Sequence, residues 1–179
     1  MSTFEQRIQQ SIQIETRFAV SLQKHGWSYF HVGATSTPPI AHLSALSGAS
    51  ESNNARMPDL MVWRKKGLTE SFFVEIKRSL VYQSEDKPCV RLPISCLQDY
   101  TNIALSGVPC WIVIMAKGVI YAVGAITAKI HQLPVKEKHR GESWCDIPLY
   151  LLQTIGTYDH PAYTQFSFVT GSFIRDNWS

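Results

Sequence analysis

The sequence has few of the features that would place it in a metal-ribbon or disulfide-rich class. It contains four cysteines, Cys89, Cys96, Cys110 and Cys145, and none of them forms a C-x-x-C pair. None of the six histidines stands at a zinc-ligand spacing from a cysteine or another histidine. The sequence therefore offers no zinc site, and its scattered cysteines favour buried thiols in a reducing compartment.

Long apolar segments and a strong charge excess are also missing. The longest apolar run is CWIVIMA, residues 110–116, far shorter than the ~20 residues that a membrane-spanning helix needs. The N-terminus, MSTFEQRIQQ, lacks the apolar region of a signal peptide. Formal net charge is only +3, which permits a nucleic-acid partner without requiring one. We expect a soluble, intracellular (cytoplasmic) protein with no membrane partner.

The 179 residues, 45% of them hydrophobic, suit a single domain with its own core. Apolar periodicity predicts helices and strands in the following order: a helix over 3–25, strands over 27–32, 59–63 and 71–76, a turn at 85–88, a helix over 95–107, and strands over 110–116 and 119–126. This order predicts an α/β layer architecture with a central mixed sheet flanked by helices.

Two segments are harder to assign from their patterns. Residues 33–55 are rich in Ser, Gly, Ala and Pro, which is typical of a long and often functional loop. The segment 130–179 has mixed patterning, with a helix or strand near 149–155 and a strand over 163–174. We expect it to be an extension that packs on the core or forms an interface.

The stretch from Pro58 to Lys77 carries the candidate chemistry. Asp59 opens one strand of a hairpin, and Glu75 and Lys77 end the other. Residues i and i+2 of a strand share a face, so Glu75 and Lys77 project together, and strand pairing can bring Asp59 beside Glu75. Two adjacent carboxylates repel each other unless a hard divalent cation lies between them. The alternative is an ordinary charge pair on one face of the hairpin.

Glu15 is the other notable acid, because it falls within the apolar stripe of the first predicted helix. The stripe comprises Phe4, Ile8, Ile12, Phe18, Ala19 and Leu22. An inward-facing carboxylate is costly unless a cation or several donors meet it. Glu15 is therefore a candidate third carboxylate, and the alternative is an acid that snorkels to solvent.

The segments MPDLMVW and FFVEIKRS resemble the PD-(D/E)XK nuclease superfamily, also called the restriction-endonuclease-like fold, over roughly residues 3–126. The resemblance implies a three-layer fold and a Mg²⁺-dependent endonuclease that hydrolyses DNA, with Mn²⁺ as a substitute ion. It implies that Asp59, Glu75 and the main-chain carbonyl of Ile76 bind metal, that Lys77 is catalytic, and that Glu15 supplies a further acid. Gln98 and Tyr100 on the following helix lie where some branches carry a glutamine and a tyrosine; for Gln98, a plain surface residue is the alternative.

DNA is the partner that this resemblance implies, in a homodimer or larger homo-oligomer of restriction, homing, resolvase or transposon type. The candidate phosphate contacts are Arg56, Arg64, Lys65, Lys66 and Arg78, and the basic run 136–140 offers a second contact. Two other functions stay open: a non-catalytic nucleic-acid-binding subunit of the same fold, and a metal-dependent RNase.

Overall fold

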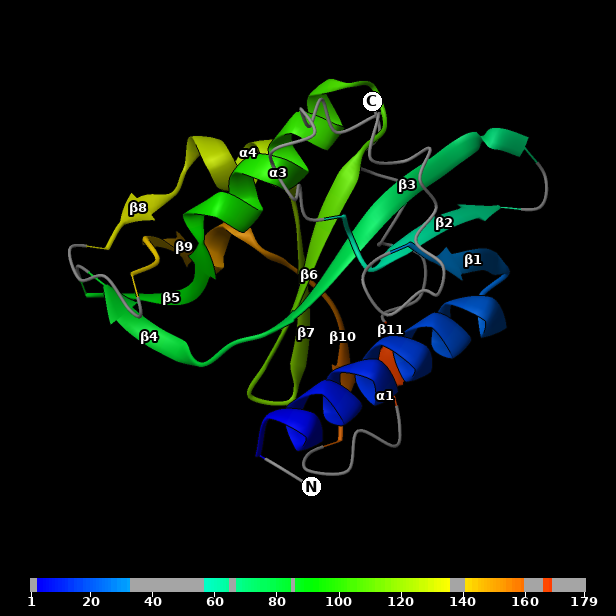
Figure 1. The fold of residues 1–179 in the computed structure, drawn as a ribbon, viewed down its shortest axis with the longest axis horizontal. Helices are drawn as coiled ribbons and strands as arrows, with labels where there is room; N and C mark the ends of the chain where they lie inside the picture. The colour runs from blue at the N-terminus through cyan, green and yellow to red at the C-terminus, as the bar shows by residue number, and fades with distance from the viewer. Residues whose placement is uncertain are drawn as a thin grey trace.

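The protein is built around a central seven-stranded mixed β-sheet (Figure 1). The computed structural model describes residues 3–32, 57–64, 67–84, 86–135, 141–159 and 166–168. In spatial order the strands are β1 (Trp27–His31), β2 (Leu60–Arg64), β3 (Gly67–Arg78), β6 (Cys110–Ala116), β7 (Val119–Gly124), β10 (Gln153–Tyr158) and β11 (Phe166–Phe168). Only the β3–β6 pair is parallel; the other neighbours run antiparallel.

Helices cover both faces of this sheet. The helix α1 (Thr3–Lys24) lies on one side, and α3 (Ile94–Leu105) and α4 (Ala125–Ile130) lie on the other (Figure 1). β3 divides its side chains between the two layers: Val74 and Ile76 join the core under α1, whereas Phe73 joins the core under α3. By the alternation of a strand, Glu75 and Lys77 face the α3 side.

The turns follow local backbone preferences. Gly26, with φ of 84°, ends α1 in the left-handed region that glycine adopts without strain. Lys117 and Gly118 connect β6 to β7 with φ of 49° and 78°. Two positive φ values in succession are the geometry of a tight two-residue hairpin turn.

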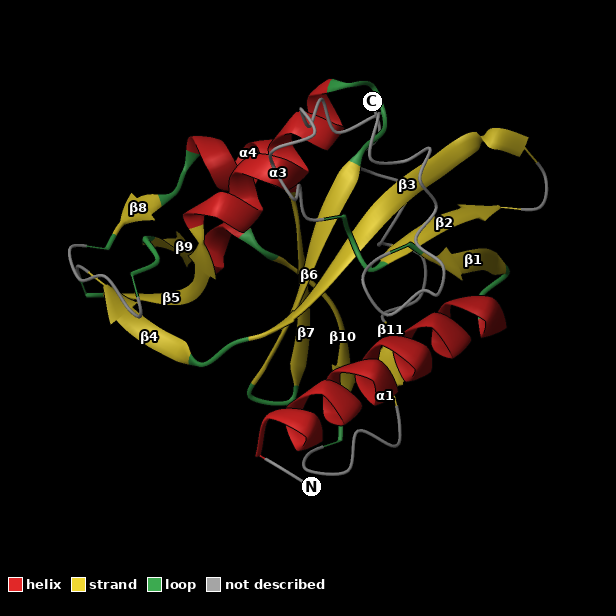
Figure 2. Cartoon of the chain, in the orientation of Figure 1, coloured by secondary structure: helices red, strands yellow, loops and turns green. Residues whose placement is uncertain are grey.

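A second, four-stranded antiparallel sheet lies beside the first, next to α3 and α4 (Figure 2). Its spatial order is β4 (Val81–Ser84), β5 (Lys87–Pro93), β9 (Trp144–Pro148) and β8 (Leu133–Pro134). The short 3₁₀ helix η1 (Leu149–Leu151) then leads from this sheet back to β10.

The first helix, the first strand, the hairpin strands, the second helix and the strand 110–116 lie where the sequence predicts them, in a mixed sheet flanked by helices. The sequence analysis missed the second sheet, since it assigned only a turn at 85–88, where Lys87 and Pro88 in fact begin β5. The segment after residue 130 is built into both sheets through β9 and β10. The predicted loop 33–55 and the basic run 136–140 lie outside the described residues.

The structure contains, over the ranges it describes, no helix with the length and apolarity that a membrane crossing requires.

Candidate functional site

The β2–β3 hairpin brings Asp59 and Glu75 together as the sequence predicts. Leu60 pairs with Val74 in antiparallel register, so Asp59, one residue before β2, falls opposite Glu75. The main-chain N–H of Ile76 donates a hydrogen bond of 2.7 Å to Asp59 Oδ2. The Asp59 side chain thus closes the strand pairing at this end, and the bond fixes where its carboxylate lies.

The environment of Asp59 disfavours its negative charge. Burial raises the pKa of its carboxyl group well above the usual range, and the charges of Glu75 and then Glu15 raise it further. Lys77 and the Ile76 N–H act in the opposite direction without cancelling that effect. Glu75 and Glu15 therefore lie close enough for their negative charges to disfavour the ionised form of Asp59, and a nearby cation would favour that form.

Lys77 supplies the nearest cation. Its ammonium forms an ion pair with Glu75 Oε1, and its side chain is 33% exposed while that of Glu75 is 2% exposed. Desolvation lowers the pKa of Lys77, but the negative charges of Glu75 and Asp59 outweigh it and raise the pKa above the ordinary lysine value. Lys77 is therefore a persistent cation at neutral pH rather than a free amine.

Glu75 keeps one oxygen available for a further ligand. Its Oε2 atom is buried and has no hydrogen-bond partner within the described part of the chain. A buried carboxylate oxygen in that condition is costly unless another group meets it. This atom is the strongest local indication that the site is built for something more than the ion pair with Lys77.

The helix α3 contributes Tyr100, which the resemblance names together with Gln98, and Cys96, which the sequence did not single out. Tyr100 is 2% exposed; burial raises the pKa of its hydroxyl most, and the adjacent charge of Glu75 raises it further. Cys96, one turn earlier and also buried, lies close enough for its thiol to influence Tyr100 and Lys77. The i, i+4 spacing of Cys96 and Tyr100 on a helix that follows the motif was the available signal.

Gln98 is not brought to the carboxylates. Its side chain is exposed, and its Nε2 donates a hydrogen bond of 2.9 Å to Asn102 Oδ1 on the same helix. Residues two positions apart on a helix point in directions that differ by about 200°, so Gln98 projects away from the face that carries Tyr100. The expected catalytic role of Gln98 has no support in this geometry, which instead fits the alternative of a surface residue.

Glu15 approaches the site from α1, on the other face of the sheet. It is 4% exposed, between the buried Ile14 and Phe18, and its charge acts on Asp59. A cavity of about 240 Å³ opens beside it and is also lined by Ile76, Lys77 and Arg78. Glu15 is thus an inward-facing acid near the motif rather than a snorkelling one. The buried face of the helix differs slightly from the predicted stripe, since Ile14 is more deeply buried than Ile12.

The basic residues expected to contact DNA are only partly placed. Arg78 is exposed at the end of β3, beside the cavity with Glu15 and Lys77. Arg64 ends β2, and its side chain lies outside the described part. Arg56, Lys65 and Lys66 also lie outside the described residues.

The donors at this site fit a hard divalent cation in kind. Asp59 and Glu75 offer carboxylate oxygens, as Mg²⁺ prefers. The nearby thiol of Cys110 stays protonated, since burial and then the charge of Glu75 raise its pKa. The described residues contain no three His, Cys, Asp or Glu side chains already arranged to hold a metal ion. Metal binding at Asp59 and Glu75, with or without Glu15 and the carbonyl of Ile76, therefore stays a prediction.

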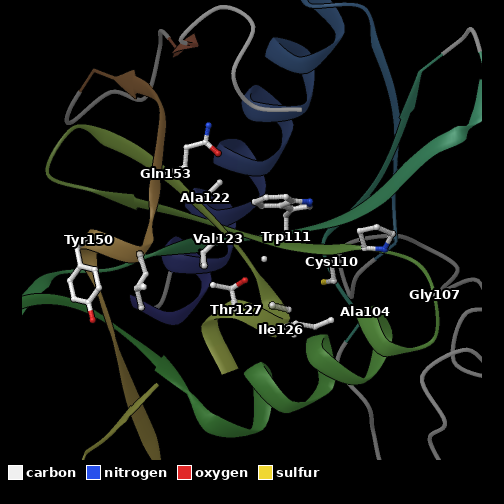
Figure 3. A pocket seen from close by; sticks show the side chains of 14 residues that line it. Ala104, Gly107, Cys110, Trp111, Ala122, Val123, Ile126, Thr127, Tyr150 and Gln153 are labelled. Atoms are coloured by element: carbon white, nitrogen blue, oxygen red, sulfur yellow. The ribbon is translucent and has the colours of Figure 1, made fainter. Parts of the chain in front are cut away.

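A larger cavity, of about 840 Å³, is lined by Cys110 and Trp111 among others, but not by Asp59 or Glu75 (Figure 3). Its lining is mainly apolar or small, with Trp111, Val123, Ile126 and the exposed Tyr150 around it. The described residues that line this cavity include no carboxylate and no basic side chain. This cavity is larger than the one beside Glu15. The titratable groups that hydrolysis needs, however, lie at Asp59, Glu75 and Lys77.

Comparison with known proteins gives no family for the chain: no protein-family model and no curated protein sequence matches it.

Proposed function

We propose that this protein is a Mg²⁺-dependent nuclease that hydrolyses DNA phosphodiester bonds at Asp59, Glu75 and Lys77. The observation that carries the proposal is the carboxylate pair at the end of the hairpin, with Asp59 half-buried, Glu75 buried with one oxygen lacking a hydrogen-bond partner in the described part of the chain, and Lys77 alongside. The order of helix, motif hairpin, helix and further strands also supports the resemblance to the restriction-endonuclease-like fold.

The residues present divide the chemistry between them. Asp59 and Glu75 would hold Mg²⁺, with Mn²⁺ as a substitute, and Glu15 lies close enough to add charge to that set. A bound ion of this kind activates water and offsets negative charge on a phosphate. The hydrogen bond from Ile76 orients the Asp59 carboxylate, and such a fixed first ligand lowers the reorganisation needed for binding.

Lys77 acts as a cation in this proposal. Because its pKa is raised rather than lowered, it is poorly suited to take a proton from water at neutral pH. An ammonium held beside the carboxylates stabilises the negative charge that develops on the phosphate. Tyr100 acts as a positioning residue, since its buried hydroxyl lies against Glu75 from α3.

The test is cleavage of supercoiled plasmid, four-way junctions, single strands and RNA in the presence of Mg²⁺. We expect the wild-type chain to cut DNA and Asp59→Ala and Lys77→Ala each to lose about 100-fold or more of the rate. Asp86→Asn removes an exposed acid from the β4–β5 turn, keeps a residue that tolerates its positive φ of 60°, and serves as a control that retains cleavage.

Wild-type-like cutting by both site variants would refute the assignment. DNA binding by a wild-type chain that never cuts would favour the non-catalytic subunit instead, and cutting of RNA alone would favour the ribonuclease. A homodimer or larger oligomer is part of the same proposal, because cutting both strands of a duplex requires two such sites.

A further inference from the structure

A second groove, of about 700 Å³, lies where the chain passes from β3 to β4. Its lining comes from both sheets: the end of β3, β6, the β6–β7 turn and β10 belong to the central sheet, and β4, β5 and β9 belong to the second sheet. Its lining combines three basic residues, Arg78, Arg91 and Lys117, with three aromatic ones, Tyr82, Trp144 and Tyr158. We call it the Arg78–Trp144 groove.

A partly buried ion pair between Arg91 and Asp146 fixes the part of the groove that contains Tyr82. Arg91 donates two hydrogen bonds to Asp146, of 2.7 Å from Nε and 3.0 Å from a terminal nitrogen, and Asp146 is 2% exposed. The same guanidinium lies 4.4 Å from the centre of the Tyr82 ring. A bidentate pair and a cation–π contact together fix Tyr82 and Arg91 on the groove wall.

The basic side of the groove is more exposed. Lys117 projects from the β6–β7 turn and Arg78 from the end of β3, and both are exposed. Among the described residues, the lining of the groove includes no acidic side chain. Asp146 pairs with Arg91, and Lys117 adds an exposed positive charge to the groove.

Position links this groove to the carboxylates. Arg78 lines both the groove and the 240 Å³ cavity that contains Glu15 and Lys77. Arg78 also follows Lys77 directly in β3. A nucleic-acid backbone bound along the groove would therefore reach the end of the strand that carries Glu75 and Lys77, although the Arg78 and Lys77 side chains leave β3 on opposite faces.

Cations alternating with aromatic rings are how proteins bind unpaired nucleic acid: the cations meet phosphates and the rings stack on bases. Bases within a duplex present edges to a protein, and their faces are hidden. The groove volume of about 700 Å³ suits one or two unpaired nucleotides. We propose that the Arg78–Trp144 groove binds the single-stranded part of a DNA substrate, which rests on the nuclease function proposed above and directs it to tailed or branched DNA.

Binding without cleavage tests the groove separately from the active site. Fluorescence anisotropy is measured in EDTA, on the full chain, with three dye-labelled probes: a blunt duplex, the same duplex with an oligothymidylate tail, and the tail sequence alone. We expect the tailed duplex and the free tail to bind about tenfold more tightly than the blunt duplex. Equal affinity for blunt and tailed duplexes overturns the proposal, as does tighter binding of an oligouridylate.

Matched variants locate the binding. Lys117→Asn removes the charge and keeps a residue that tolerates positive φ, so the turn is retained. It should weaken tail binding and reduce the slope of log affinity against log salt by about 0.7. Lys24→Asn removes an exposed charge from the end of α1, outside the groove, and should leave both unchanged. Identical behaviour of the two variants overturns the proposal.

The aromatic contribution has its own pair of variants. Tyr82→Phe keeps the ring and should retain tail binding, whereas Tyr82→Leu should weaken it about tenfold; thermal melting verifies that each variant is folded. Full tail binding by folded Tyr82→Leu contradicts stacking in the groove. Tail preference in a chain that never cuts DNA would refute the nuclease and leave the groove assignment standing, so the two proposals fail separately.

Discussion

The surroundings of Asp59 disfavour the ionised form of its carboxyl group. Its carboxyl group is desolvated and faces Glu75 and Glu15, with only Lys77 and one N–H in its favour. A side chain chosen for stability alone would be neutral here. Retaining an acid at such a position is the usual trade between stability and function.

Replacing Asp59 by Asn tests that trade. Asn keeps an oxygen for the Ile76 N–H and removes the buried charge, so the variant should gain about 1 kcal/mol at pH 7, or roughly 2–4 °C in melting temperature. Because the folded-state pKa is raised, wild-type stability falls as pH rises from the ordinary aspartate range, near pH ~3.9, through the folded pKa. The advantage of Asn should therefore be absent in acid and grow with pH.

Melting curves of both proteins between acid and neutral pH measure this difference. Asp86→Asn is the control, because Asp86 is exposed and its positive φ of 60° suits Asn. Added Mg²⁺ should raise the melting temperature of the wild type and leave that of Asp59→Asn unchanged. A variant that is less stable than the wild type at pH 7 would show that Asp59 is a structural acid.

At the scale of elements, α3 shows that the role of a helical residue depends on the face of the helix on which it lies. Cys96 and Tyr100 point inward to the hairpin, and Gln98 and Asn102 bond to each other on the outside. Tyr100→Phe should lower DNA cleavage about tenfold, because Glu75 loses a hydroxyl neighbour. Gln98→Ala should leave the rate unchanged.

A pH–rate profile separates positioning from simple destabilisation in Tyr100→Phe. A positioning role predicts a shifted profile with unchanged substrate affinity, whereas a merely structural role lowers the amount of folded protein at every pH. Loss of cleavage in Gln98→Ala with no change in Tyr100→Phe would reverse the assignment of the two faces.

Local pattern was sufficient for the strands and helices that carry the motif. CWIVIMA predicts a strand buried on both faces, and every residue of β6 is buried. The alternation of β3 likewise predicts that Glu75 and Lys77 share a face. The pairing of β5 with β9 was not predictable in this way, because the partners lie far apart along the chain: Arg91 pairs with Asp146. The strands β4 and β5 form a local hairpin, of which the sequence indicated only the turn at 85–88. Tyr100 was named from the resemblance together with Gln98, but its contact with Glu75 joins residues far apart in the sequence and was not predictable from local pattern.

The hydrophobic cores on both faces of the central sheet include residues from the segment after position 140, which lies beyond the motif. The strand β10 pairs with β7 and places Ile155 and Tyr158 in the core under α1, while β9 places Cys145 and Ile147 in the core under α3. Both cores of the central sheet therefore contain residues from beyond position 140. The resemblance to a nuclease ends near residue 126, but the folding unit does not.

A chain that ends after Gln132 should consequently fail to fold. It would lose the buried side chains of Ile147, Leu152 and Ile155, each contributing about 1.5–3 kcal/mol, and it would leave β7 as an open apolar edge. That loss approaches the ~5–15 kcal/mol net stability of a whole domain. Circular dichroism should show no cooperative melting transition, and adding residues 133–179 as a separate chain should restore one. A cooperative transition in the shortened chain alone would mean that the motif region forms a domain without its last strands.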